Sequence, residues 1–133
     1  MSLQQTEFTP GSNITANDSG TGPSAILPEE LDGWNWGGFL LTWVWAVGNK
    51  VWIGLAALAP VPFANLAVGI LLGIKGNEWA WQNKKWKSIE HFSHTQRVWL
   101  YWGIAALIAP VIGLIGAIMI IVGILGYYGI VKF

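Results

Sequence analysis

The chain has 133 residues, ten of them tryptophan and none cysteine, and its formal net charge at pH 7 is zero. The lack of cysteine excludes disulfides, thiolate metal sites and cysteine nucleophiles, and the balanced charge argues against general binding of nucleic acid. Charged residues make up only 11% of the chain and lie outside two long apolar runs, which indicates an all-α integral membrane protein.

Residues 1–32 are rich in Gly, Ser, Thr, Asn and Pro and show no apolar periodicity. Such a segment alone cannot offset the entropy lost on ordering, so we predict a flexible polar N-terminal tail over 1–32. The remainder, 33–133, is expected to form one membrane domain. Within it, 33–48 is uncharged and has apolar residues at helical spacing, but it is shorter than the ~20 residues of a span. We expect an interfacial or re-entrant helix there.

Residues 51–74 carry no charge and are long enough to cross a bilayer, so they predict a first transmembrane helix. Pro60 and Pro62 are expected to kink it. Asn65 lies in mid-span, where we expect a hydrogen bond to a neighbouring helix or to a carbonyl freed by proline, with a role in transport as the alternative.

Residues 77–97 predict a basic amphipathic loop or helix at the membrane surface, although Lys85 does not fit the cationic face of the helix. Because cations are retained on the cytoplasmic side, the loop 75–97 is expected to face the cytoplasm. With two spans, the tail and the C-terminus would then lie outside, whereas a crossing by 33–48 would bring the tail inside. Anionic lipid headgroups are the expected partners of four cations: Lys84, Lys85, Lys87 and Arg97.

Residues 98–131 are again free of charge and predict a second, long transmembrane helix, tilted or bent at Pro110. Tryptophan suits the boundary between lipid tails and headgroups. The residues assigned to that interface are Trp34, Trp36, Trp43, Trp52, Trp79, Trp81, Trp86, Trp99 and Trp102.

Shifting the sequence by fifty positions aligns Trp52 with Trp102 and Ala59-Pro60-Val61 with Ala109-Pro110-Val111. The match suggests two copies of one unit, an interfacial helix followed by a span, arranged as an inverted repeat. Small residues let helix backbones approach in lipid, either between the two spans or toward another subunit. The candidates for such packing are Gly69, Gly73, Ala109, Gly113 and Ala117.

His91 and His94 share a helical face near Glu90, which makes them candidates for binding a pigment or other cofactor. A structural metal site usually needs three or four ligands, so we expect no metal, and solvent-exposed polar residues are the simpler reading. No catalytic constellation or phosphate-binding loop is present in the sequence, so we expect no enzyme.

Three short motifs stand out: Gly33-Trp-Asn-Trp-Gly-Gly-Phe, Gly76-Asn-Glu-Trp-Ala-Trp-Gln-Asn and Gln96-Arg97-Val98-Trp99. With them the chain resembles a domain-of-unknown-function family of small bacterial membrane proteins. The resemblance covers about residues 33 to 105 and implies a bacterial cytoplasmic-membrane protein, but no activity. The matched positions are Trp34, Asn35, Trp36, Asn77, Trp79, Trp81, Asn83 and Trp86.

These features favour a small accessory subunit of a larger membrane complex, respiratory or photosynthetic, or a homo-oligomer. Three alternatives stay open. The basic loop could make the chain a scaffold that binds lipid or protein at the membrane surface, Asn65 could belong to an oligomeric transporter or channel, and the histidines could belong to a pigment-binding subunit. No cofactor is predicted, although a pigment or a lipid is compatible with the sequence.

Overall fold

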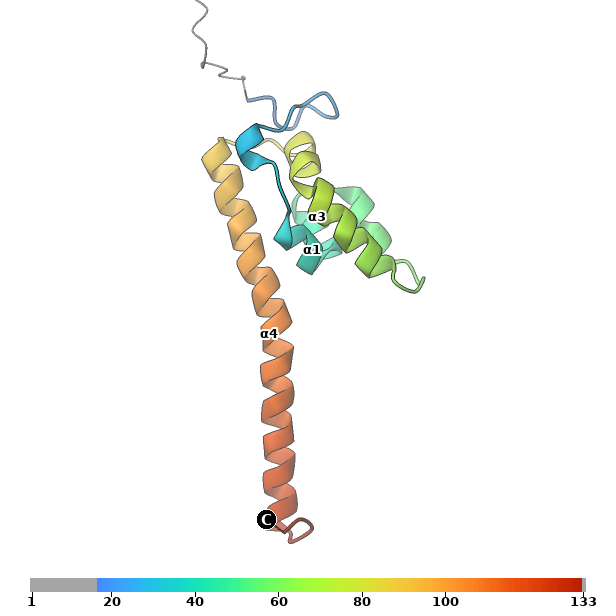
Figure 1. Ribbon diagram of the computed structural model, residues 1–133, viewed down its shortest axis with the longest axis vertical. Helices are drawn as coiled ribbons and strands as arrows, with labels where there is room; N and C mark the ends of the chain where they lie inside the picture. Colours follow the sequence, from blue (N-terminus) through green and yellow to red (C-terminus); the bar gives the residue numbers. More distant parts are fainter. Residues whose placement is uncertain (1–16, 133) are drawn as a thin grey trace, which may run out of the picture.

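The computed structural model describes residues 17–132, and within that range the protein is all-helical. Residues 17–88 form a small head that packs against the N-terminal part of one long helix, whose remainder projects alone (Figure 1). The predicted all-α fold class is confirmed. In chain order the elements are the 3-10 helix η1 (Glu29–Leu31), α1 (Trp36–Leu41), α2 (Trp43–Gly48), the 3-10 helix η2 (Trp52–Leu58), α3 (Ala64–Asn83) and α4 (Ile89–Tyr127).

Helix α4 is the one helix among the described residues that is long and apolar enough to cross a membrane. Its 39 residues span about 58 Å at 1.5 Å per residue. It begins at Ile89, earlier than the predicted start at Val98, because the Ser88 hydroxyl accepts a hydrogen bond from the His91 amide and caps the first turn. The helix continues through Pro110 and ends at Tyr127.

The predicted transmembrane helix over 51–74 is not formed as one helix, so two transmembrane helices are not confirmed. Helix η2 ends at Leu58, and α3 begins only at Ala64. Pro60 and Pro62 each disfavour helical backbone at the residue before them, and Phe63 adopts a left-handed conformation with φ 63°. Two prolines this close therefore break the segment where the sequence suggested a kink.

The segment 77–97 is also not the single amphipathic element that was predicted. Its first residues, up to Asn83, belong to α3; Lys84 is extended, and α4 starts at Ile89. Lys85 lies in this break, which explains why it did not fit a helical face. The segment 33–48 is helical as expected, but it is divided into α1 and α2 at Thr42, whose φ is 43°.

An inverted repeat is not confirmed either, because the aligned residues have different structures. Trp52 starts a 3-10 helix and Pro60 lies in the loop that follows, whereas Trp102 and Pro110 both lie inside α4. Isolated Pro110 is accommodated in a long helix, while the paired prolines of the first copy are not.

Residues 17–32 pack against the rest of the head, which corrects the prediction of a flexible tail over that part of 1–32. Ser19, Ala25 and Leu31 are buried, and the Gly20 amide donates to the Trp81 carbonyl at 2.8 Å. The contact places this segment beside the end of α3, on the same side as the basic residues 84–87. The rest of the predicted tail, 1–16, lies outside the described residues.

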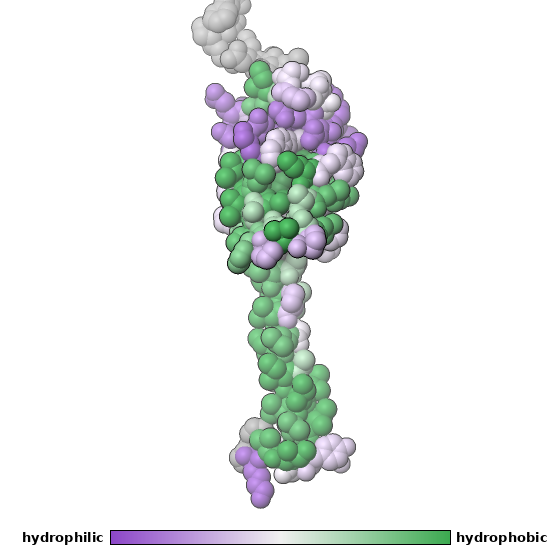
Figure 2. All heavy atoms as spheres, turned by 90° about the vertical axis from the view of Figure 1, so that its right-hand side faces the viewer, coloured by the Kyte–Doolittle hydropathy of each residue, from purple (hydrophilic) through white to green (hydrophobic). Residues whose placement is uncertain are grey.

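Polar and apolar side chains are separated along the long axis. On the face shown in Figure 2, strongly hydrophilic residues gather at the end of the head where α4 begins, and the rest of the head and the projecting part of α4 are mainly hydrophobic. After Arg97 the next charged residue is Lys132, beyond the end of α4. The uncharged part of the molecule thus lies between two polar ends.

Candidate functional site

A network of side-chain amides lies where α1, α2, α3 and α4 meet, and Gln96 of α4 is at its centre. The Gln96 carbonyl oxygen accepts hydrogen bonds from Trp45 Nε1 at 2.8 Å and Asn35 Nδ2 at 3.0 Å. Its Nε2 donates to Asn49 Oδ1 at 2.9 Å. Asn35 Nδ2 also donates to Asn77 Oδ1 at 2.6 Å. One side chain of α4 is therefore bonded directly to α2 and to the ends of α1 and α2, and is connected to α3 through Asn35.

The amides of this network are also tied to the backbone. Asn35 Oδ1 accepts from the Gly38 amide at 2.7 Å and caps α1, and Asn77 Nδ2 donates to the Leu31 carbonyl at 2.9 Å. Asn35 and Asn49 are buried, and no buried side-chain polar atom among the described residues lacks a hydrogen-bond partner. A fully satisfied buried network fixes the arrangement of helices. Asn35 and Asn77, whose roles the sequence left unassigned, thus have a structural explanation.

The sequence alone does not predict a role for Asn49, and it points to Gln96 only as part of the motif Gln96-Arg97-Val98-Trp99. The signal was present in both cases as an amide next to an apolar run. The network cannot be recognised without the tertiary structure, which brings residues 35, 45, 49, 77 and 96 together.

Three of the tryptophans form the core of the head. Trp45 is 0% exposed, Trp86 1% and Trp81 2%, and the rings of Trp81 and Trp86 both lie edge-on to Phe92. Trp81 and Trp86 are therefore not available to lipid, which corrects their assignment to the membrane interface. Trp79 and Trp99 are half-buried. Exposed rings remain at Trp34, Trp36, Trp43, Trp52 and Trp102.

Asp18 joins the N-terminal segment to this core. Its carboxylate accepts hydrogen bonds from the Ile26 amide at 2.8 Å and from Trp81 Nε1 at 2.9 Å. These donors, the Ile26 amide first, favour the charged form and hold the pKa of Asp18 below its usual range.

The four predicted headgroup cations have different surroundings. Lys84 donates to the Gly48 carbonyl at 3.3 Å, and its ammonium lies 4.7 Å from the centre of the Trp86 ring. Lys85 donates to the Asn17 carbonyl at 2.8 Å. Lys87 and Arg97 are exposed. All four lie between the end of α3 and the third turn of α4, so they are grouped toward the polar end of the head.

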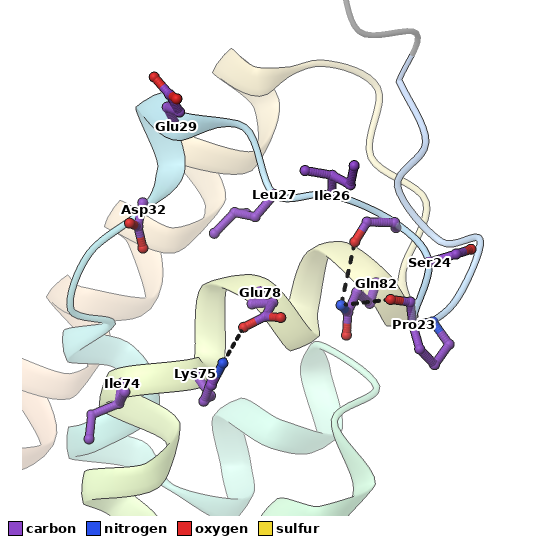
Figure 3. Close-up of a pocket in the computed structure, with 11 residues that line it drawn as sticks. Pro23, Ser24, Ile26, Leu27, Glu29, Asp32, Ile74, Lys75, Glu78 and Gln82 are labelled. Atoms are coloured by element: carbon purple, nitrogen blue, oxygen red, sulfur yellow. Dashed lines mark hydrogen bonds and ion pairs between the residues drawn. The ribbon is translucent and has the colours of Figure 1, made fainter.

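His91 and His94 are both exposed, and the His91 ring lies 5.6 Å from that of Trp86. Within residues 17–132 no three His, Asp or Glu side chains are arranged to hold a metal ion. A polar hollow of about 580 Å³ lies between the N-terminal segment and α3, where Gln82 reaches toward the Pro23 and Ala25 carbonyls and Lys75 pairs with Glu78 at 2.8 Å (Figure 3). Gln82, Lys75 and Glu78 are thus engaged with other groups of the hollow.

A second hollow, which we call the apolar groove, lies between α1–α2 and α4 and has a volume of about 710 Å³. Its lining is almost entirely hydrophobic. The residues are Leu41, Val44, Thr95, Val98, Trp99, Trp102, Ala105, Ala106 and Ala109.

The predicted packing residues fall into two groups. Gly69 and Gly73 of α3 face the interior of the head. A Cβ added at Gly69 would lie 3.1 Å from the Phe39 carbonyl oxygen, and one added at Gly73 would overlap the Trp34 ring. An added Cβ at Gly113, Gly116 or Gly123 of α4 would meet nothing within 4 Å. Ala109 and Ala117 are exposed as well. Small residues are therefore used for packing inside the head and are unpartnered on distal α4.

No protein-family model matches the chain, and no curated protein or solved structure matches it significantly. The resemblance to the bacterial domain-of-unknown-function family accordingly stays a prediction.

Proposed function

We propose that this chain is a non-catalytic protein of the bacterial cytoplasmic membrane and serves as an accessory subunit of a larger membrane complex, respiratory or photosynthetic. Helix α4 crosses the bilayer once, and the hydrophobic part of the head lies in the cytoplasmic leaflet. The section from Val98 to Tyr127 measures about 45 Å, more than the ~30 Å hydrocarbon core, so it can cross with a tilt.

The orientation follows from the positions of the charges. The basic residues 84–97 and the N-terminal segment that packs beside them lie at one polar end, which the positive-inside rule assigns to the cytoplasm. A single crossing then puts Lys132 on the opposite side. This arrangement replaces the two-span topology, in which the N-terminal segment and the C-terminus would share a side.

The observation that carries the assignment to a complex is the contrast between the two groups of glycines. Gly69, Gly73 and Gly76 of α3 each have a neighbour where a Cβ would be, while Gly113, Gly116 and Gly123 of distal α4 have open space. In lipid, stripes of small residues allow close helix–helix approach. Gly113, Gly116 and Gly123 lie close to one side of α4, so the partner is expected to be a transmembrane helix of another subunit.

A photo-crosslinking amino acid introduced at Gly116 tests the proposal in native membranes. The matched control is Ile118, two residues on and on the opposite side of the same exposed helix. We expect position 116 to yield a crosslinked product with a different membrane protein, which mass spectrometry would identify, and position 118 to yield little. Equal products at both positions, none at either, or only a crosslinked homodimer would contradict the accessory-subunit assignment.

A further inference from the structure

We infer that the apolar groove holds an acyl chain of one anionic phospholipid, whose headgroup lies at the cationic end of the groove. The inference rests on the proposed insertion of the head into one leaflet. It adds a specific lipid ligand, whose binding is separate from assembly with a partner subunit.

The groove has the chemistry and dimensions of a lipid-chain site. Thr95 is the only polar side chain in its lining, and its hydroxyl is satisfied by the His91 carbonyl at 2.8 Å. Along α4 the groove runs from Thr95 to Ala109, about 21 Å, which covers the ~15 Å depth of one leaflet. Its volume of about 710 Å³ lies within the usual range for small-ligand sites.

Cationic and hydrogen-bonding groups lie at the polar end of the groove. His91 precedes Thr95 by one turn and continues the face formed by Thr95, Val98 and Trp102. On the other wall, the ammonium of Lys84 is bound to the Gly48 carbonyl, one turn beyond Val44. Gly48 itself packs on the ring of Trp99, a lining residue, so Lys84 lies close to the groove.

The charges at this end favour an anionic headgroup. Lys84 is the cation whose contacts place it beside the groove, because Lys85 is bound to the Asn17 carbonyl and Arg97 lies about 120° around α4 from His91, beside Asn77. The one carboxylate of residues 84–97, Glu90, lies about 100° around the helix from His91 and so also away from the groove face. The Lys84 ammonium has three N–H donors; the Gly48 carbonyl accepts from one of them, and the Trp86 ring lies 4.7 Å away. A phosphodiester can accept from a remaining donor, whereas a second apolar helix lying in the groove would offer Lys84 no anion.

The test uses native mass spectrometry of the purified full-length protein in detergent, with phosphatidylglycerol or phosphatidylcholine added. We expect the wild type to retain one phosphatidylglycerol and to prefer it several-fold over phosphatidylcholine. Ala106→Phe fills the groove and should reduce retention about tenfold, while Ala67→Phe, on an exposed part of α3, should leave it unchanged. Val44→Phe serves the same purpose from the opposite wall should Ala106→Phe fail to fold, as judged by helical circular dichroism.

Charge is tested separately. Lys84→Gln should reduce the preference for phosphatidylglycerol, and Lys132→Gln, at the far end of α4, should not. Retention of lipid by folded groove-filled variants would overturn the inference, as would a dimer joined through the groove. Equal retention of both lipids by the wild type would overturn the anionic headgroup. Since the purified protein needs no partner, this outcome is independent of crosslinking at Gly116.

Discussion

Gln96 uses three of its side-chain hydrogen-bonding positions within the head, all of them toward other elements. Replacing it with Leu would leave Trp45 Nε1 and Asn49 Oδ1 without this partner in a buried region. Each such group costs ~1–3 kcal/mol. We therefore expect Gln96→Leu to lower the free energy of unfolding by about 3 kcal/mol, measured by denaturation in detergent. Glu90→Gln, on the exposed part of the same helix, should change it by less than ~0.5 kcal/mol.

Asp18 should make docking of the N-terminal segment sensitive to acid. Because its pKa is lowered in the folded state, the stabilisation is fully present above the unfolded pKa of about 4 and is lost as pH falls through the lower, folded value. We expect lower hydrogen-exchange protection factors, which correct for the slower intrinsic exchange in acid, at the Gly20 and Gly22 amides below about pH 4.

Asp18→Asn should show those lower protection factors already at neutral pH and should lose the acid-dependent step. Glu30→Gln, at an exposed carboxylate in the same segment, is the control and should behave like the wild type. An acid step that persists in Asp18→Asn would show that another group is responsible.

At the scale of elements, the close crossing of α1 and α4 depends on Gly37, where an added Cβ would lie 2.7 Å from Trp99 Cβ. Gly37→Ala would have to separate the two helices, and such overpacking costs ~1–3 kcal/mol. Gly116→Ala meets open space and should leave the purified protein unchanged or stabilise it by up to ~1 kcal/mol, because alanine favours helix. Thermal unfolding of both variants in detergent measures the contrast. A large loss in Gly116→Ala would mean that distal α4 already packs against something in the purified state.

The elements also show which features a sequence can reveal. The charge-free run after Arg97 correctly predicted a long apolar helix, because one isolated proline, Pro110, does not interrupt it. The same rule failed for residues 51–74, where local backbone restrictions at Pro60 and Pro62 outweigh hydrophobicity. The packing of residues 17–32 had no local signal, since it depends on contacts such as Asp18 with Trp81, more than sixty positions away. The same holds for the amide network and for the burial of Trp81 and Trp86.

At the scale of the whole molecule, a single crossing predicts the sides on which three positions lie. The chain contains no native cysteine, so single cysteines can be introduced without background. In intact cells a membrane-impermeant maleimide should label Lys132→Cys, while Ser24→Cys and Lys87→Cys should react only after lysis. Labelling of Ser24→Cys in intact cells would instead support two crossings.

The head and the single projecting helix give the molecule unequal widths at its two ends (Figure 1). If the head lies in the cytoplasmic leaflet, each copy occupies more area there than in the opposite leaflet, and the molecule acts as a wedge. Copies that accumulate in one patch would expand the cytoplasmic leaflet and bend the bilayer so that it bulges toward the cytoplasm. The same shape would draw the protein to membrane regions already curved in that sense.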